Sequence, residues 1–133
     1  MHRVRVISLA VVSCLLAAGL LIAAPEASAQ THKSGQFTGP KANTGFVTHS
    51  KNSAKNVLTL SDDFQVPDTP DPHWQVVDSR GNAFLLDRLT LKADRVAKSI
   101  TLPAGIRDVA KVQIYCAWAE TVLGETSFDA PVK

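Results

Sequence analysis

The most regular alternation of side chains along the chain runs from Lys111 to Phe128. In an extended strand, successive side chains point to opposite faces, and here both faces are largely apolar. One face carries Val112, Ile114, Cys116 and Trp118, and the other carries Gln113, Tyr115, Ala117 and Ala119. A strand that is apolar on both faces is normally central in its sheet. The pattern therefore predicts a central strand with Cys116 directed into a core, and then a last strand over residues 122–128.

Shorter strand patterns precede this one, and turn-forming residues separate them. They cover residues 45–49, 56–60, 73–78 and 83–86. The turn signals recur about every ten residues, which is the spacing of a sandwich or barrel. For this reason we expect strands rather than a helix over residues 85–96, although apolar side chains there also share a helical face. The sequence predicts an all-β fold with a single antiparallel β-sandwich domain.

A basic and then apolar stretch opens the chain. Arg3 and Arg5 precede an apolar run over residues 6–24, and the small residues 27–29 match a signal-peptidase site. We expect a signal peptide over residues 1–29, cleavage before Gln30, and export to a periplasmic, cell-envelope or extracellular location. The apolar run is close to the length of about 20 residues that spans a bilayer, so a membrane anchor formed by the uncleaved signal is the alternative.

The mature chain is long enough for one small domain. Its first part, residues 30–44, is rich in Gly, Ser, Thr, Asn and Lys, which predicts a flexible polar segment. Residues 45–128 form the expected sandwich, and residues 129–133 an expected frayed tail. Basic and acidic residues nearly balance, so we expect no nucleic-acid partner. The lysines of residues 30–56 form either a solvated face or a contact with an anionic cell-envelope surface.

Cys116 is the only cysteine left once residues 1–29 are removed, because the other cysteine is Cys14. It therefore has no partner for a disulfide within the chain, although an exported protein meets an oxidising environment. Three interpretations stay open: a small hydrophobic core residue, a redox thiol assisted by Tyr115 and Trp118, or a disulfide between two copies in a homodimer. The neighbours supply no positive charge, and apolar surroundings predict a raised thiol pKa.

Metal and cofactor chemistry is limited by the ligands available. A blue-copper site takes two His, one Cys and a weak axial Met, but Met1 is the only methionine and no histidine follows Cys116. The carboxylates of residues 62–71 match no calcium loop. We therefore assign no metal site, and the cofactor stays unknown, with haem and copper both open. For a haem, His73 and His49 are the candidate axial ligands.

No catalytic residue can be assigned from the sequence. The chain has no nucleophile elbow, no zinc-protease motif and no Gly-rich phosphate loop after a strand. A conventional enzyme is therefore not expected. Trp74 and Trp118 both lie in alternating strand patterns, which predicts packing in the core, while a stacking platform for sugars is the alternative.

Three segments resemble one known module. They are LTLSDDF from Leu58, PDPHWQVVDS from Pro70 and LPAGIRDVAKVQIYCAW from Leu102. In this order they are similar to the DM-thirteen domain, which is often found beside DOMON domains and is proposed to carry electrons. The resemblance covers about residues 35–128. It implies a β-sandwich, and it matches Cys116 to the characteristic cysteine of the family.

These features predict an exported β-sandwich of the DM-thirteen type that binds a protein or cell-envelope partner without catalysing a reaction. The first alternative is an electron-transfer module that uses Cys116. The second alternative is a structural homodimer linked through the same cysteine.

Overall fold

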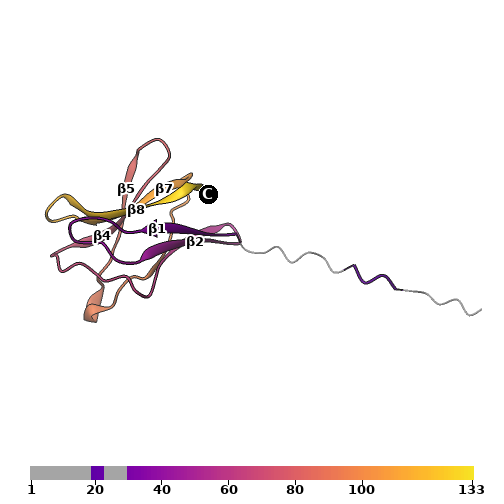
Figure 1. The fold of residues 1–133 in the computed structure, drawn as a ribbon, viewed down its shortest axis with the longest axis horizontal. Helices are drawn as coiled ribbons and strands as arrows, with labels where there is room; N and C mark the ends of the chain where they lie inside the picture. Colours follow the sequence, from indigo (N-terminus) through magenta and orange to yellow (C-terminus); the bar gives the residue numbers. More distant parts are fainter. Residues whose placement is uncertain (1–18, 23–29) are drawn as a thin grey trace, which may run out of the picture.

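The computed structural model describes residues 19–22 and 30–133. Residues 30–133 form two antiparallel four-stranded sheets, which confirms the predicted β-sandwich (Figure 1). One sheet has the strand order β1-β2-β3-β6 and the other β5-β4-β7-β8. Buried apolar side chains from both sheets form one core. The strands are β1 (Thr31–Gln36), β2 (Phe46–Asn52), β3 (Lys55–Leu60), β4 (Pro72–Val77), β5 (Ala83–Arg88), β6 (Ser99–Thr101), β7 (Val109–Cys116) and β8 (Thr121–Val132).

β7 is a central strand, as the alternation predicted, and lies between β4 and β8. Val112, Ile114 and Cys116 point into the core and are at most 1 % exposed. The strand ends at Cys116 because residues 117–120 form a turn, in which Glu120 has a φ of 52°. Trp118 therefore leaves the core face and is 75 % exposed. The prediction that this tryptophan packs in the core is wrong.

Trp74 of β4 does pack in the core, as predicted, and its side chain is fully buried. Its indole Nε1–H donates a hydrogen bond to the carbonyl oxygen of Ala97, 2.8 Å away. This bond satisfies the only polar group of the indole. The bond also ties the connection between β5 and β6 to β4. This connection contains a short 3₁₀ turn, η1 (Lys92–Asp94). Residues 85–96 contain no α-helix, as expected, although the strand there ends at Arg88.

The two predicted hairpins are present. β2 and β3 pair down to Asn52 and Lys55, and Ser53 between them takes a positive φ of 56°. β4 and β5 are joined by a turn in which Asp78 Oδ1 accepts hydrogen bonds from the backbone N–H groups of Arg80 and Asn82. An aspartate at the start of a turn commonly makes such local bonds, which explains why this polar stretch reverses the chain.

The segment over residues 30–44 differs from the flexible polar segment expected from its composition. Residues 31–36 form β1, which pairs with β2 in antiparallel register. Phe37 and Ala42 are buried in the core, and Ser34 Oγ accepts a hydrogen bond from the Val47 N–H. This polar segment buries only two apolar side chains. It still forms regular structure, because its backbone N–H and C=O groups pair with those of β2.

After β1 the chain crosses from the first sheet to β8 of the second. Thr38 and Glu125 exchange two backbone hydrogen bonds of 2.9 Å, and the Ala42 N–H donates to the backbone of β8. Gly124 permits this close approach, because a Cβ atom at that position would overlap the carbonyl oxygen of Ala42. Residues 38–42 therefore join the two sheets along the edge where β1 lies beside β8.

The C-terminal end also belongs to the fold. β8 continues to Val132, which is buried and pairs with Val109. Residues 129–132 therefore differ from the frayed tail that we expected.

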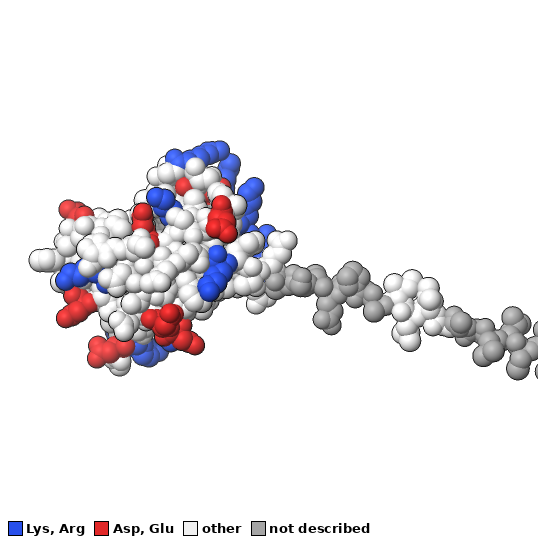
Figure 2. Space-filling model, in the orientation of Figure 1, with Lys and Arg blue, Asp and Glu red and all other residues white. Residues whose placement is uncertain are grey.

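The predicted signal peptide, with its cleavage site and Cys14, lies outside the described residues except for residues 19–22. Within the described ranges, no helix has the length and apolar character needed to cross a membrane. Side chains of both charge signs share the face of the domain seen in Figure 2.

Substituting Gly124 tests the close approach between β8 and residues 38–42. We expect Gly124→Ala to lower the free energy of unfolding by about 3 kcal/mol, because the new methyl group displaces backbone rather than a flexible side chain. The measurement is urea unfolding of the variant beside Gly105→Ala, whose Cβ would meet nothing within 4 Å. Equal stability of the two variants would contradict the described approach.

The two tryptophans give a matched pair of substitutions. We expect Trp74→Phe to cost about 2 kcal/mol of stability, through the lost hydrogen bond and the unfilled volume, and Trp118→Phe to cost less than about 0.5 kcal/mol. Urea unfolding gives both values. Quenching of the remaining tryptophan by iodide should be weak in Trp118→Phe and strong in Trp74→Phe, and the reverse order would contradict the structure.

Candidate functional site

Cys116 lies where β7 ends, beneath two loops. It pairs with Pro72 of β4 on one side and with Thr121 of β8 on the other. The next residue, Ala117, donates its N–H to the carbonyl oxygen of Asp71, 3.0 Å away. The turn 117–120 and the loop before β4 therefore close over the thiol, which is 1 % exposed and has no disulfide.

Backbone N–H groups surround the sulfur of Cys116. The hydrogen bond from Ala119 has the largest effect and lowers the pKa of the thiol below its usual range, while partial desolvation opposes it. Weaker contributions in the same direction come from the backbones of Asp71 and Trp118 and from the side chain of Thr69. Thr69 Oγ1 itself is buried and makes no hydrogen bond within normal geometry to any described residue. The predicted rise in the pKa of Cys116 is therefore wrong in sign, because N–H groups of its own turn outweigh the apolar side chains.

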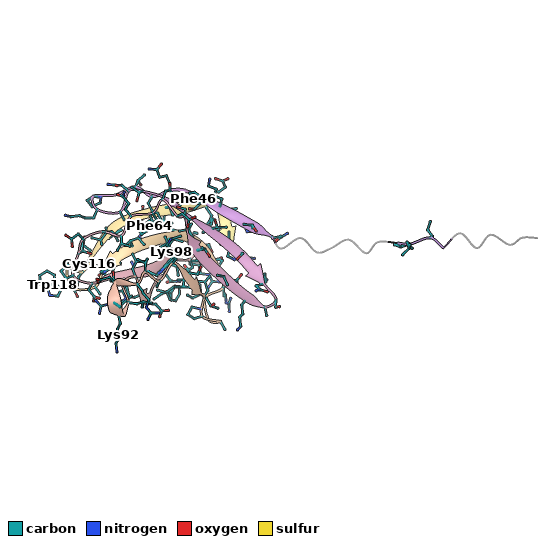
Figure 3. All side chains as sticks on the ribbon, turned by 90° about the horizontal axis from the view of Figure 1, so that it is seen from below. Phe46, Phe64, Lys92, Lys98, Cys116 and Trp118 are labelled. Carbon is teal, nitrogen blue, oxygen red and sulfur yellow. The ribbon has the colours of Figure 1, made fainter. Side chains whose placement is uncertain are left out.

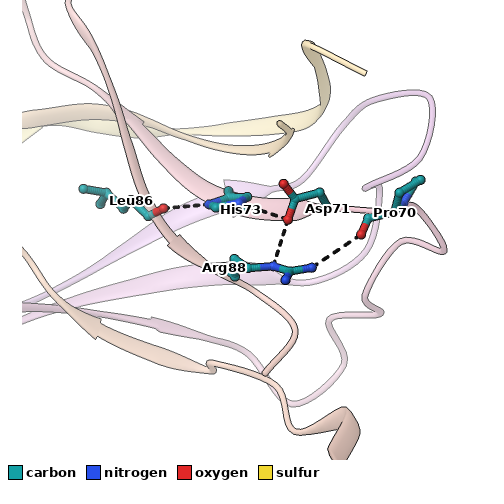
Figure 4. A network of polar contacts seen from close by, with 5 residues as sticks. All are labelled: Pro70, Asp71, His73, Leu86 and Arg88. Atoms are coloured by element: carbon teal, nitrogen blue, oxygen red, sulfur yellow. Dashed lines mark hydrogen bonds and ion pairs between the residues drawn. The ribbon is translucent and has the colours of Figure 1, made fainter. Parts of the chain in front are cut away.

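A polar network lies directly beside this end of β4 (Figure 4). The Asp71 carboxylate forms an ion pair with Arg88 Nε at 2.8 Å and contacts His73 Nε2 at 3.2 Å. His73 Nδ1 is 2.8 Å from the carbonyl oxygen of Leu86. Both partners of His73 are acceptors, so the two bonds form together only when both ring nitrogens carry a proton. Arg88 is half exposed, and an exposed ion pair of this kind contributes at most about 1 kcal/mol.

The three residues named as redox candidates are neighbours in sequence, but their side chains go to different places. Cys116 points into the core, whereas Tyr115 lies on the other face of β7, half buried and opposite His73 of β4. Trp118 projects from the end of the domain, as Figure 3 shows. The structure therefore brings Tyr115 and His73 side by side and does not bring Trp118 onto the face that holds the thiol.

The two candidate haem ligands lie in different sheets. His49 belongs to β2 and is 1 % exposed, with its ring beside Phe128. Its Nε2 is 2.9 Å from Asn56 Oδ1 and its Nδ1 is 3.2 Å from His32 Nδ1. His73 holds its ring nitrogens against Asp71 and Leu86. Neither imidazole presents an unengaged nitrogen to an open surface, so the haem hypothesis gains no support from this geometry.

The acidic residues of the 62–71 loop do not converge. Across residues 19–22 and 30–133, no group of three or more His, Cys, Asp or Glu side chains is placed to hold a metal ion. Asp71 acts instead as the acceptor for His73 and Arg88.

Two contacts were missed by the sequence reasoning. The contact between His32 and His49 depends on β1, and no apolar alternation marked that strand. The Asp71–Arg88 pair joins two segments whose register could not be set from the turn residues alone, since the β4–β5 pairing contains an irregularity between His73 and Gln75. The hairpin signal around residues 79–82 located the two strands but not this pairing.

The chain matches no model of a known protein family, no curated protein and no solved structure. The resemblance to the DM-thirteen domain therefore stays a prediction that rests on the three sequence segments.

Titration of Cys116 tests the arrangement of N–H groups around its sulfur. We expect the thiolate absorbance of the folded protein to rise at a lower pH than that of the urea-unfolded chain. Because the pKa is lowered in the folded state, the thiolate adds stability above the thiol pKa of the unfolded chain, and this contribution is lost as the pH falls through the folded-state pKa.

The same preparation tests how well the sulfur is covered. Alkylation of Cys116 should be about 100-fold slower in the folded than in the unfolded protein at a pH where both are thiolate, since reaction requires a local opening. A folded-state titration at or above the unfolded value, or equal alkylation rates, would contradict the described site.

Proposed function

We propose that the chain is an exported, non-enzymatic β-sandwich module that binds a cell-envelope partner through the end of the domain that carries Trp118. The observation that carries this proposal is the exposure of Trp118 on a turn held to the domain on both sides. The predicted signal peptide supports export.

An exposed tryptophan on a fixed turn is well suited to anchor a partner. A partner that covers this exposed side chain would gain about 2–3 kcal/mol of binding free energy from its burial. The turn is fixed by the Ala117–Asp71 bond and by the pairing of Cys116 with Thr121. The backbone that carries the ring therefore loses little conformational freedom when the ring binds a partner, and tryptophan is enriched among residues that dominate binding energy.

Polar groups lie on the loop that is hydrogen-bonded to this turn. Asp71 is hydrogen-bonded through its backbone to the residue before Trp118, and its carboxylate holds Arg88, which is 55 % exposed. A surface with one aromatic anchor and adjoining charged donors and acceptors suits either a protein or a saccharide of the envelope.

Co-sedimentation tests this proposal. The mature protein is taken from the exported fraction of its host and mixed with isolated envelopes of the same host. We expect retention to fall at least about 10-fold in Trp118→Ala, which removes the anchor, and to be partly kept in Trp118→Phe. Lys92→Ala, an exposed change on η1, is the matched control and should bind as the unaltered protein does. Equal retention of all three variants would overturn the proposed binding surface.

The second candidate is the electron-transfer role that the DM-thirteen resemblance implies for Cys116. The N–H groups around the sulfur favour this candidate, because they stabilise a thiolate without a neighbouring cation. The test compares redox titrations of the unaltered protein and Cys116→Ser, both isolated from the host. A redox transition that disappears in Cys116→Ser would support this candidate, and identical titrations would remove it.

A homodimer linked through Cys116 is the third candidate, and the covered sulfur disfavours it. The turn 117–120 would have to open before two such sulfurs could meet. Non-reducing electrophoresis of exported material decides this point, since only a dimer that reducing agent dissociates would support the covalent form.

A further inference from the structure

Two histidine side chains meet at the first residues of the mature chain. His32 of β1 and His49 of β2 are directly opposite in the antiparallel register. Their Nδ1 atoms are 3.2 Å apart, and their rings lie 27° from parallel with centroids separated by 5.4 Å. His49 is buried, whereas His32 is exposed and lines a surface groove with Asp129 and Pro131. In this pair, His49 is therefore held in place inside the domain, and His32 is accessible to solvent.

The hydrogen bonds of His49 determine which of its nitrogens can bind an ion. Asn56 Oδ1 is an acceptor 2.9 Å from His49 Nε2, so Nε2 carries the proton and Nδ1 keeps its lone pair. Burial has the largest effect and lowers the pKa of His49, while the hydrogen bond with Asn56 opposes it, and the net shift is downward. A histidine whose second nitrogen is held by an oxygen acceptor is the usual arrangement of a metal ligand.

The separation of the two Nδ1 atoms suits a shared ion. Nitrogen ligands lie about 2.0–2.1 Å from a bound transition metal. Two such nitrogens separated by 3.2 Å subtend an angle of about 100–105° at the ion, between the square-planar and tetrahedral values. In the metal-free protein, His32 Nδ1–H donates to the Nδ1 lone pair of His49. Binding of an ion would displace this proton, and His32 would then carry its proton on Nε2 and turn its Nδ1 lone pair toward the ion.

A third nitrogen comes from the predicted processing of the chain. Cleavage before Gln30 would create an amino group two residues ahead of His32. The ammonium group of Lys33 is directed to the Phe46 ring, with Nζ 3.9 Å from the ring centre, whereas the positive charge of Lys51 does act on His49.

We propose that His32 and His49 bind one copper(II) ion through their Nδ1 atoms, and that the amino group of Gln30 completes a nitrogen-ligand site. Copper(II) is the ion favoured by nitrogen ligands among the divalent first-row metals, and export places the chain where copper stays oxidised. The inference shares the cleaved signal with the proposed function but does not depend on Trp118. Loss of partner binding in Trp118→Ala would therefore leave the copper site standing, and loss of copper binding in His32→Gln would leave the partner surface standing.

Copper titration of the mature protein tests the site. The protein is purified from the exported fraction, and mass spectrometry verifies that Gln30 carries a free amine. We expect one copper(II) per chain, a visible spectrum of nitrogen ligation, and no intense thiolate-to-copper band. His32→Gln should weaken binding at least about 10-fold, and His73→Gln, the matched histidine control in the other sheet, should leave it unchanged.

Further measurements keep the test decisive if His49→Gln folds poorly. In the unaltered protein, paramagnetic copper(II) should broaden the imidazole resonances of His32 and His49 and leave those of His73 sharp. Acetylation of the amino group should also weaken binding. Unchanged affinity in His32→Gln, broadening confined to His32, or a thiolate band from Cys116 would each overturn the proposed site. Copper that binds the folded His49→Gln variant as tightly as the unaltered protein would overturn it as well.

Discussion

The fold depends on the close approach of residues 38–42 to β8 at Gly124. The first sheet and the second sheet share a core, but along the β1–β8 edge this segment also ties them together through backbone hydrogen bonds. Backbone groups can come this near only where no Cβ intervenes. The domain has no disulfide within residues 30–133, so its stability rests on the core and on contacts of this kind.

The two ends of the domain follow from this arrangement. At one end, β1 is held against β2 in the register that brings His32 to His49. At the other end, the turn after β7 covers Cys116 and leaves Trp118 in solvent. Figure 3 shows Trp118 projecting on the side opposite the start of β1. The proposed partner surface and the proposed copper site are therefore separate features of one rigid sandwich, and a substitution at one should leave the other intact.

Most of the sandwich could be predicted from the sequence, because alternation at Val112, Ile114 and Cys116 and the turn residues around them are local signals. The position of Trp118 could not, since the strand ends one residue after Tyr115 and alternation cannot show where a turn begins. β1 was missed because its pairing with β2 comes from backbone groups rather than from apolar side chains. The lowered pKa of Cys116 was missed for a similar reason, because N–H groups of a turn carry no sequence signature.

Native-state hydrogen exchange tests most directly whether the first residues of the mature chain are part of the domain. The Thr38 and Ala42 amides donate to β8, so we expect them to exchange as slowly as amides of the central strand β7 and only through global unfolding. Rapid exchange at Thr38 and Ala42 while β7 stays protected would show a mobile segment, and would contradict both the bridge between the sheets and the histidine pair that depends on it.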